Sequence, residues 1–166
     1  MNNFFESYIE SSCKTLRSLD IKKLEKISQI ILKKIKSNNS IFVCGNGGSA
    51  SVANHFLCDY NKGIKKTSKK KLLPKIISLS SSVEVITAIG NDIDFDDIFI
   101  HQIENLYEKN DLLILFSCSG KSKNIIKLIE YAKKKKIMMI KFFGFTKKSY
   151  VKKNEITFSI NNNNYG

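Results

Sequence analysis

The sequence predicts an α/β fold built on a parallel sheet, and three observations support this prediction. Short apolar runs alternate with stretches of helical periodicity along most of the chain, as in successive β-α-β units. The apolar runs are nearly continuous, so their strands should be covered on both faces. The chain has 166 residues, 42% of them hydrophobic, which suffices for one domain with a substantial core. We therefore expect a single domain with helices on both faces of the sheet.

The first 38 residues predict two helices. In the first, apolar residues recur at helical spacing between Asn3 and Leu19 (Phe4, Phe5, Tyr8, Ile9 and Leu16). Asp20 can cap the second, in which one stripe of the surface is apolar (Ile21, Leu24, Ile27, Ile31 and Ile35). We expect a helical hairpin over residues 1–38 that packs on residues 39–166 or on a neighbouring subunit.

From residue 39 onward, strands and helices are expected to alternate. The predicted strands are 41–44, 76–79, 112–117, 137–142 and 156–160. The predicted helices are 49–60, 83–89, 96–107 and 122–134. The lysine-rich segment 61–75, which contains Pro74, is expected to be irregular.

The net charge of +13 raises the question of nucleic-acid binding. Of the 28 basic residues only Arg17 is an arginine, whereas nucleic-acid readers rely on arginine for bidentate contacts. We therefore expect no nucleic-acid partner, but a positive electrostatic potential that attracts small anions.

No apolar run reaches the length of a membrane span, no signal-peptide pattern is seen, and the four cysteines are scattered. We expect a cytoplasmic protein without membrane contact.

The turn after the first predicted strand has the composition of an anion-binding loop. Residues 45–49 read Gly-Asn-Gly-Gly-Ser and lead directly into a predicted helix. Glycines let backbone N–H groups approach an anion, and the helix N-terminus adds roughly half a positive charge. Ser49 is expected to cap the helix and to donate its hydroxyl to phosphate. The loop also fits a dinucleotide pattern, but residues 61–83 offer no acid for a ribose, so no nucleotide cofactor is expected.

A second polar turn, residues 117–122, follows the third predicted strand. It reads Ser-Cys-Ser-Gly-Lys-Ser and again precedes a helix. The carboxyl ends of parallel strands share one edge of the sheet, so the two turns should meet there and bind phosphate. The alternative is an ordinary serine-capped turn, which would need only one hydroxyl.

Beyond the first loop, His55 and Asp59 stand four residues apart, so a helix places them on one face. They are either a functional imidazole–carboxylate pair or a partly buried pair without chemistry. The other histidine, His101, is expected to be a surface or hydrogen-bonded residue outside the site.

Together these motifs resemble the sugar isomerase (SIS) domain family, and within it the phosphoheptose isomerases. The resemblance rests on GNGGSA at 45–50 with His55 downstream, TAIGND at 87–92 and S-x-S-G-x-S at 117–122. It implies a five-stranded parallel sheet with flavodoxin-like layering, in a homotetramer with sites between subunits. It also implies isomerisation of sedoheptulose 7-phosphate to D-glycero-D-manno-heptose 7-phosphate, which supplies capsule or lipopolysaccharide synthesis.

The resemblance further implies roles for individual residues. Asp59 stands where phosphoheptose isomerases usually carry a glutamate as general base, and His55 resembles a residue that binds zinc in some members. We therefore expect Asp59 to be catalytic, and His55 and Asp59 to be zinc ligands. Asn46 is expected either to shape the first turn or to contact the sugar. The expected substrate-binding residues are Asn46, Gly47, Gly48, Ser49, Asp92, Ser117, Ser119 and Ser122.

The chain departs from the family pattern in two respects. Asp59 is one methylene shorter than glutamate, which withdraws its carboxylate by roughly 1.5 Å, and misplacement on that scale can cost about 10²-fold in rate. The family also carries a catalytic histidine on a C-terminal helix that would begin where this sequence ends. The main alternative is therefore a non-catalytic sugar-phosphate-binding SIS module, and a second is a decayed product that folds poorly.

Overall fold

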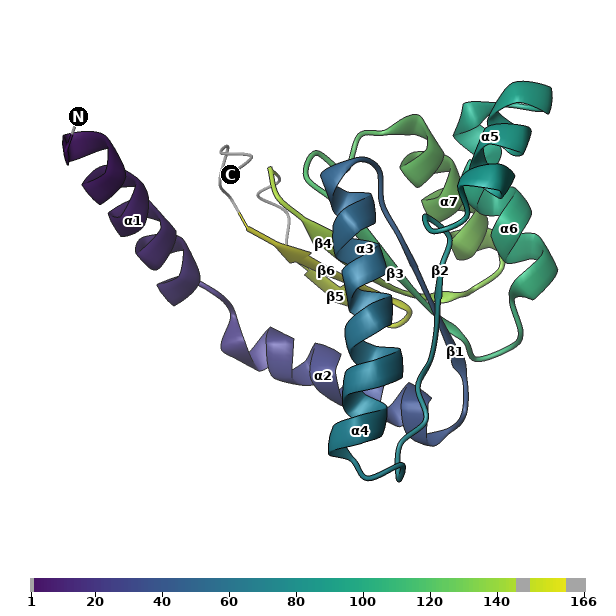
Figure 1. The fold of residues 1–166 in the computed structure, drawn as a ribbon, viewed down its shortest axis with the longest axis horizontal. Helices are drawn as coiled ribbons and strands as arrows, with labels where there is room; N and C mark the ends of the chain where they lie inside the picture. Colours follow the sequence, from purple (N-terminus) through teal and green to yellow (C-terminus); the bar gives the residue numbers. More distant parts are fainter. Residues whose placement is uncertain (1, 146–149, 161–166) are drawn as a thin grey trace.

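The computed structural model describes residues 2–145 and 150–160, which form one sheet flanked by helices (Figure 1). The six strands lie in the order β2-β1-β3-β4-β6-β5. Their bounds are β1 Ser40–Cys44, β2 Lys75–Ser78, β3 Leu112–Ser117, β4 Met138–Phe143, β5 Tyr150–Lys152 and β6 Glu155–Ser159. Every pairing among the first five strands of this order is parallel, which confirms the predicted fold class.

The edge strand β5 was not expected from the sequence. It spans three residues and pairs antiparallel with β6, since the two strands are joined by a tight turn. A strand this short has too few positions for a periodic pattern, so only its pairing with β6 reveals it.

The helices follow the predicted order. They are α1 Asn2–Arg17, α2 Ile21–Lys36, α3 Gly48–Cys58, α4 Lys65–Thr67, α5 Val83–Asp92, α6 Ile98–Leu106 and α7 Lys123–Lys134. A π-helical segment, Asp59–Ile64, joins α3 to α4, and a 3₁₀ turn, Phe95–Asp97, precedes α6. None of the helices within the described residues is both long and apolar enough to cross a membrane.

Two cores lie on opposite faces of the sheet. Ile41 and Val43 of β1 face the side covered by α2 and α3, whereas Phe42 and Cys44 face the side covered by α6 and α7. This alternation follows from the two-residue repeat of a strand. Because both faces are covered, β1 is apolar at four successive positions, as the sequence suggested.

The expectation of an irregular segment at 61–75 was wrong for its first part. The helix that begins at Gly48 continues through the π-helical segment and α4 to Thr67. Lysine is a good helix former, and the Asn61 side chain anchors the helix by hydrogen bonds to both the N–H and the C=O of Ile76. The chain leaves the helix only after Thr67, before Pro74.

The predicted hairpin of two N-terminal helices is also not formed. The α2 helix buries Ile27, Ile31 and Ile35 against the sheet, but α1 projects away from the rest of the chain (Figure 1). Phe4 and Phe5 remain 68% and 66% exposed as a result. The buried part of the α2 stripe, Ile27, Ile31 and Ile35, packs on the sheet and is therefore not available to α1. Packing of α1 on a neighbouring subunit stays a prediction.

Candidate functional site

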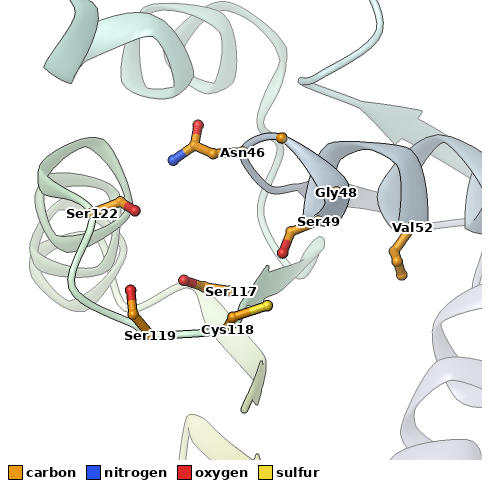
Figure 2. Close-up of a pocket in the computed structure, with 9 residues that line it drawn as sticks. Asn46, Gly48, Ser49, Val52, Ser117, Cys118, Ser119 and Ser122 are labelled. Carbon is orange, nitrogen blue, oxygen red and sulfur yellow. The ribbon is translucent and has the colours of Figure 1, made fainter. Parts of the chain in front are cut away.

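The two polar turns predicted from the sequence meet at the carboxyl ends of β1 and β3. They enclose a cavity of about 520 Å³, shown in Figure 2 and called here the serine cavity. It is lined by Asn46, Gly47, Gly48, Ser49, Val52, Ser117, Cys118, Ser119 and Ser122. Seven of the eight expected substrate-binding residues are thus brought together by the strand order.

Glycine is required in the first turn at two positions. A Cβ on Gly45 would lie 2.7 Å from the carbonyl carbon, carbonyl oxygen and Cβ of Ser49. Gly47 has a φ of 54°, in the left-handed region that favours glycine. These two positions let the chain reverse tightly from β1 into α3, so that the first N–H groups of α3 border the cavity.

Ser49 does not cap α3 as predicted. The helix begins at Gly48 with Gly47 as its N-cap, and Ser49 lies inside the first turn. The left-handed conformation of Gly47 starts the helix one residue earlier than the serine pattern suggests. The Ser49 hydroxyl instead points into the serine cavity (Figure 2).

The second turn holds its hydroxyls ready to donate. The Ser117 Oγ accepts from the N–H of Gly120 at 3.0 Å, and the Ser119 Oγ accepts from the N–H of Lys121 at 3.2 Å. Each oxygen accepts from the backbone, which leaves its O–H proton for a ligand. Ser122 is the N-cap of α7, yet its side chain makes no capping bond to the part of the chain that the structure describes. The serine-capped alternative therefore does not account for this turn.

The electrostatic character of the cavity favours an anion. The N-termini of α3, with 11 residues, and α7, with 12 residues, both border it. Each contributes partial positive charge, and none of the residues that line the cavity is acidic. Hydroxyl and backbone N–H donors around a space of this size suit a phosphate group.

The side chains of His55 and Asp59 contact each other outside the serine cavity. The His55 Nε2 lies 3.3 Å from the Asp59 Oδ2, and the side chains are 77% and 62% exposed. The partly buried pair considered from the sequence is therefore wrong. On a helical wheel Ser49, Val52, His55 and Asp59 share one face of the helix, so a continuous stripe leads from the cavity to the pair.

The expected zinc site at His55 and Asp59 stays a prediction. An imidazole and a carboxylate are suitable zinc ligands, but a zinc site needs three or four protein ligands or water. Among the described residues there is no group of three His, Cys, Asp or Glu side chains that could hold a metal. These residues alone do not complete a zinc site.

Two other residues singled out from the sequence lie apart from the cavity. Asp92 ends α5, is exposed, and accepts a hydrogen bond from Asn91 Nδ2 at 2.7 Å. Its expected contact with a sugar remains a prediction. His101 lies partly buried in α6, on the face of the sheet opposite α3, and its expected role outside the site stays a prediction.

Sequence reasoning missed two residues that hold the first turn in place. Ser80 donates to the C=O of Gly45 at 2.8 Å and accepts from its N–H at 3.1 Å. Asn124, only 2% exposed, exchanges hydrogen bonds with Asn46. Ser80 follows β2, at the same edge of the sheet as the other turns, and this position was the available signal for it.

Comparison with known proteins agrees with the geometry. The SIS domain model matches residues 4–144. A phosphoheptose isomerase of Aliarcobacter butzleri is 37% identical over 92% of this chain and 77% of its own length. One from Thermodesulfovibrio yellowstonii is 34% identical over 85% of this chain and 69% of its own length.

Solved structures show the same relationship. A phosphoheptose isomerase from Francisella tularensis superposes with a TM-score of 0.78 at 26% identity, over 98% of this chain and 84% of that one. The sequence match, the shared fold and the cavity at the strand ends agree. The chain therefore belongs to the SIS domain family, and within that family to the phosphoheptose isomerases.

Proposed function

We propose that this protein is an isomerase that converts sedoheptulose 7-phosphate to D-glycero-D-manno-heptose 7-phosphate. The observation that carries the proposal is the serine cavity, where hydroxyls of two turns and two helix N-termini surround one space. The relationship to phosphoheptose isomerases supports the choice of substrate.

The phosphate of the substrate occupies the serine cavity in this proposal. Ser49, Ser117, Ser119 and Ser122 donate hydroxyl hydrogen bonds, and the first N–H groups of α3 and α7 add to them. Such contacts recognise a phosphate but not the length of the carbon chain. The rest of the sugar extends along the face of α3 towards His55 and Asp59.

Asp59 acts as the general base. It lies ten residues after Ser49, about 15 Å along the helix axis, and both side chains lean towards the helix N-terminus. The reacting carbons of a heptose 7-phosphate are at the end remote from the phosphate, which suits this separation. The carboxylate removes a proton from C1 of the ketose, and an enediolate forms. Return of a proton to C2 gives the aldose.

The enediolate needs an acid or a metal to neutralise its oxygens. His55 is the one described histidine on this face, and it is paired with Asp59 rather than placed across from it. We therefore assign the second group to a neighbouring subunit or to residues outside those described. A zinc ion bound through His55 and Asp59 would require ligands from the same sources. No nucleotide takes part, because the isomerisation transfers no electrons to a cofactor.

The assembly and setting follow from the same proposal. The exposed apolar face of α1, with Phe4, Phe5 and Ile9, would be covered by other subunits of a homotetramer. The four cysteines are all free, which suits the reducing cytoplasm. The heptose phosphate would then supply capsule or lipopolysaccharide synthesis.

A non-catalytic sugar-phosphate-binding module is the second candidate. It is favoured by the shorter carboxylate of Asp59 and by the position of His55, which is paired with Asp59 rather than placed across from it. Both candidates share the serine cavity, so binding alone does not distinguish them. Turnover does.

Calorimetry and a turnover assay with sedoheptulose 7-phosphate test the proposal together. Ser49→Ala and Ser119→Ala should each weaken affinity by about 1–2 kcal/mol, the scale of a hydrogen bond to a charged group. Asp59→Asn should keep the affinity but lower turnover at least ~10²-fold. Unchanged affinity in both serine variants would show that the site is wrongly placed. Tight binding by the parent chain without turnover would favour the binding module.

A further inference from the structure

The buried side chain of Asn124 and the side chain of Asn46 form a reciprocal amide pair. The Asn46 Nδ2 donates to Asn124 Oδ1 at 2.8 Å, and the Asn124 Nδ2 donates to Asn46 Oδ1 at 3.1 Å. Asn124 is 2% exposed, and Asn46 is half-buried. Two opposed hydrogen bonds fix both the separation and the mutual orientation of the amide groups.

This pair connects the two turns that make the serine cavity. Asn46 belongs to the turn after β1 and lies at the rim of the cavity (Figure 2), whereas Asn124 lies in the first turn of α7, two residues after Ser122. The residues are 78 positions apart in the sequence. The pair therefore sets how far the first turn stands from the N-terminus of α7.

A second anchor holds the first turn from the other side. The Ser80 hydroxyl, after β2, makes hydrogen bonds with both the N–H and the C=O of Gly45. Gly45 and Asn46 are thus held between β2 and α7. A turn fixed at both flanks presents its N–H groups already ordered, so it loses less conformational entropy on binding than a loose turn would.

We propose that Asn124 is a positioning residue, which acts through Asn46 to hold the phosphate-binding turn in its binding geometry. The Asn46 side chain then shapes the turn rather than contacting the sugar, because its carbonyl and one amide proton are occupied by Asn124. Loss of either amide leaves the other without its partner at a largely buried position, so the turn shifts or loosens. This inference rests on the proposed phosphate site.

A double-mutant cycle with inorganic phosphate and sedoheptulose 7-phosphate as probes tests the inference. Asn46→Ala and Asn124→Ala should each weaken the affinity for both probes about tenfold. The affinity of the double variant should lie within about twofold of that of either single variant, since both changes remove the same interaction. If the change at the buried Asn124 impairs folding, Asn46→Ala still tests the inference, because this variant should show the same tenfold loss of affinity.

Asn61→Ala is the matched control. Asn61 also makes two side-chain hydrogen bonds, but to Ile76 of β2 and away from the serine cavity. It should lower the melting temperature as much as Asn124→Ala does and leave phosphate affinity unchanged. A change in affinity that accompanies Asn124→Ala but not Asn61→Ala supports positioning over general stability.

Three results would overturn the inference. The first is a phosphate affinity that stays unchanged in Asn124→Ala. The second is a double variant in which the affinity losses of the two single variants multiply. The third is a phosphate affinity of Asn46→Ala that is far lower than that of Asn124→Ala. The last result would mean that Asn46 contacts the ligand directly. Ser119→Ala, measured alongside, distinguishes failure of this inference from failure of the proposed phosphate site. If it also leaves phosphate affinity unchanged, the proposed site itself has failed.

Discussion

Replacement of Gly45 by alanine tests the close approach on which the phosphate-binding turn depends. The added Cβ would lie 2.7 Å from three atoms of Ser49, two of them backbone. Carbon atoms pack best at about 3.5–4.0 Å, so the overlap amounts to about 1 Å. The backbone atoms of Ser49 cannot rotate away. The first turn of α3 must therefore move relative to β1, against the anchors provided by Ser80 and Asn124.

The cost follows from that displacement. Overpacking of this kind typically destabilises by about 1–3 kcal/mol, and a chain of this length loses about 2–4 °C in Tm per kcal/mol. Gly45→Ala should therefore melt about 2–12 °C lower than the parent chain. Its affinity for phosphate should fall at least about tenfold, because the N–H groups of the turn and the Ser49 hydroxyl move together.

Differential scanning calorimetry and titration with inorganic phosphate measure both effects. Gly63→Ala is the control, since a Cβ there meets no atom within 4 Å and the residue lies in the helical segment after α3. It should leave the phosphate affinity unchanged and keep or raise Tm, by up to about 1 kcal/mol of stability. If Gly45→Ala melts and binds like the parent chain, the tight turn is not what shapes the site.

Three further outcomes follow from the structure. Asp59→Glu should raise turnover with sedoheptulose 7-phosphate, because the resemblance implies a glutamate as general base at this position, one methylene longer than aspartate. A rate assay that shows lower turnover would place the base elsewhere. Phe5→Ser should shift the proposed homotetramer towards monomer in light scattering, because this side chain is 66% exposed on α1. An unchanged mass would exclude α1 from the proposed subunit contact. Burial raises the pKa of the Cys44 thiol, so iodoacetamide at pH 8 should modify the exposed Cys13 and Cys58 and spare Cys44 in the folded protein. Mass spectrometry of the labelled peptides checks this, and equal labelling of Cys44 would contradict its buried position.

The sequence by itself determined the strands of the parallel sheet and the two turns of the site. Each predicted strand is a short run of mostly apolar residues. Each of the two turns carries glycine and serine directly before a helical pattern. These signals are local, since they depend on neighbours a few positions away. The rule that carboxyl ends of parallel strands share one edge then brought the turns together. For this reason seven of the eight expected binding residues line the cavity.

Only the tertiary structure decided how these parts are held and where the remaining residues lie. The pairing of Asn46 with Asn124 and the contacts of Ser80 with Gly45 join segments 78 and 35 residues apart. No local pattern encodes such contacts, because they depend on how closely separate strands and helices approach in space. The same holds for β5, which forms only by pairing with β6, and for the direction of α1, whose apolar face has no partner within this chain's described residues. Periodicity reports which side of an element is apolar, whereas packing decides what that side meets.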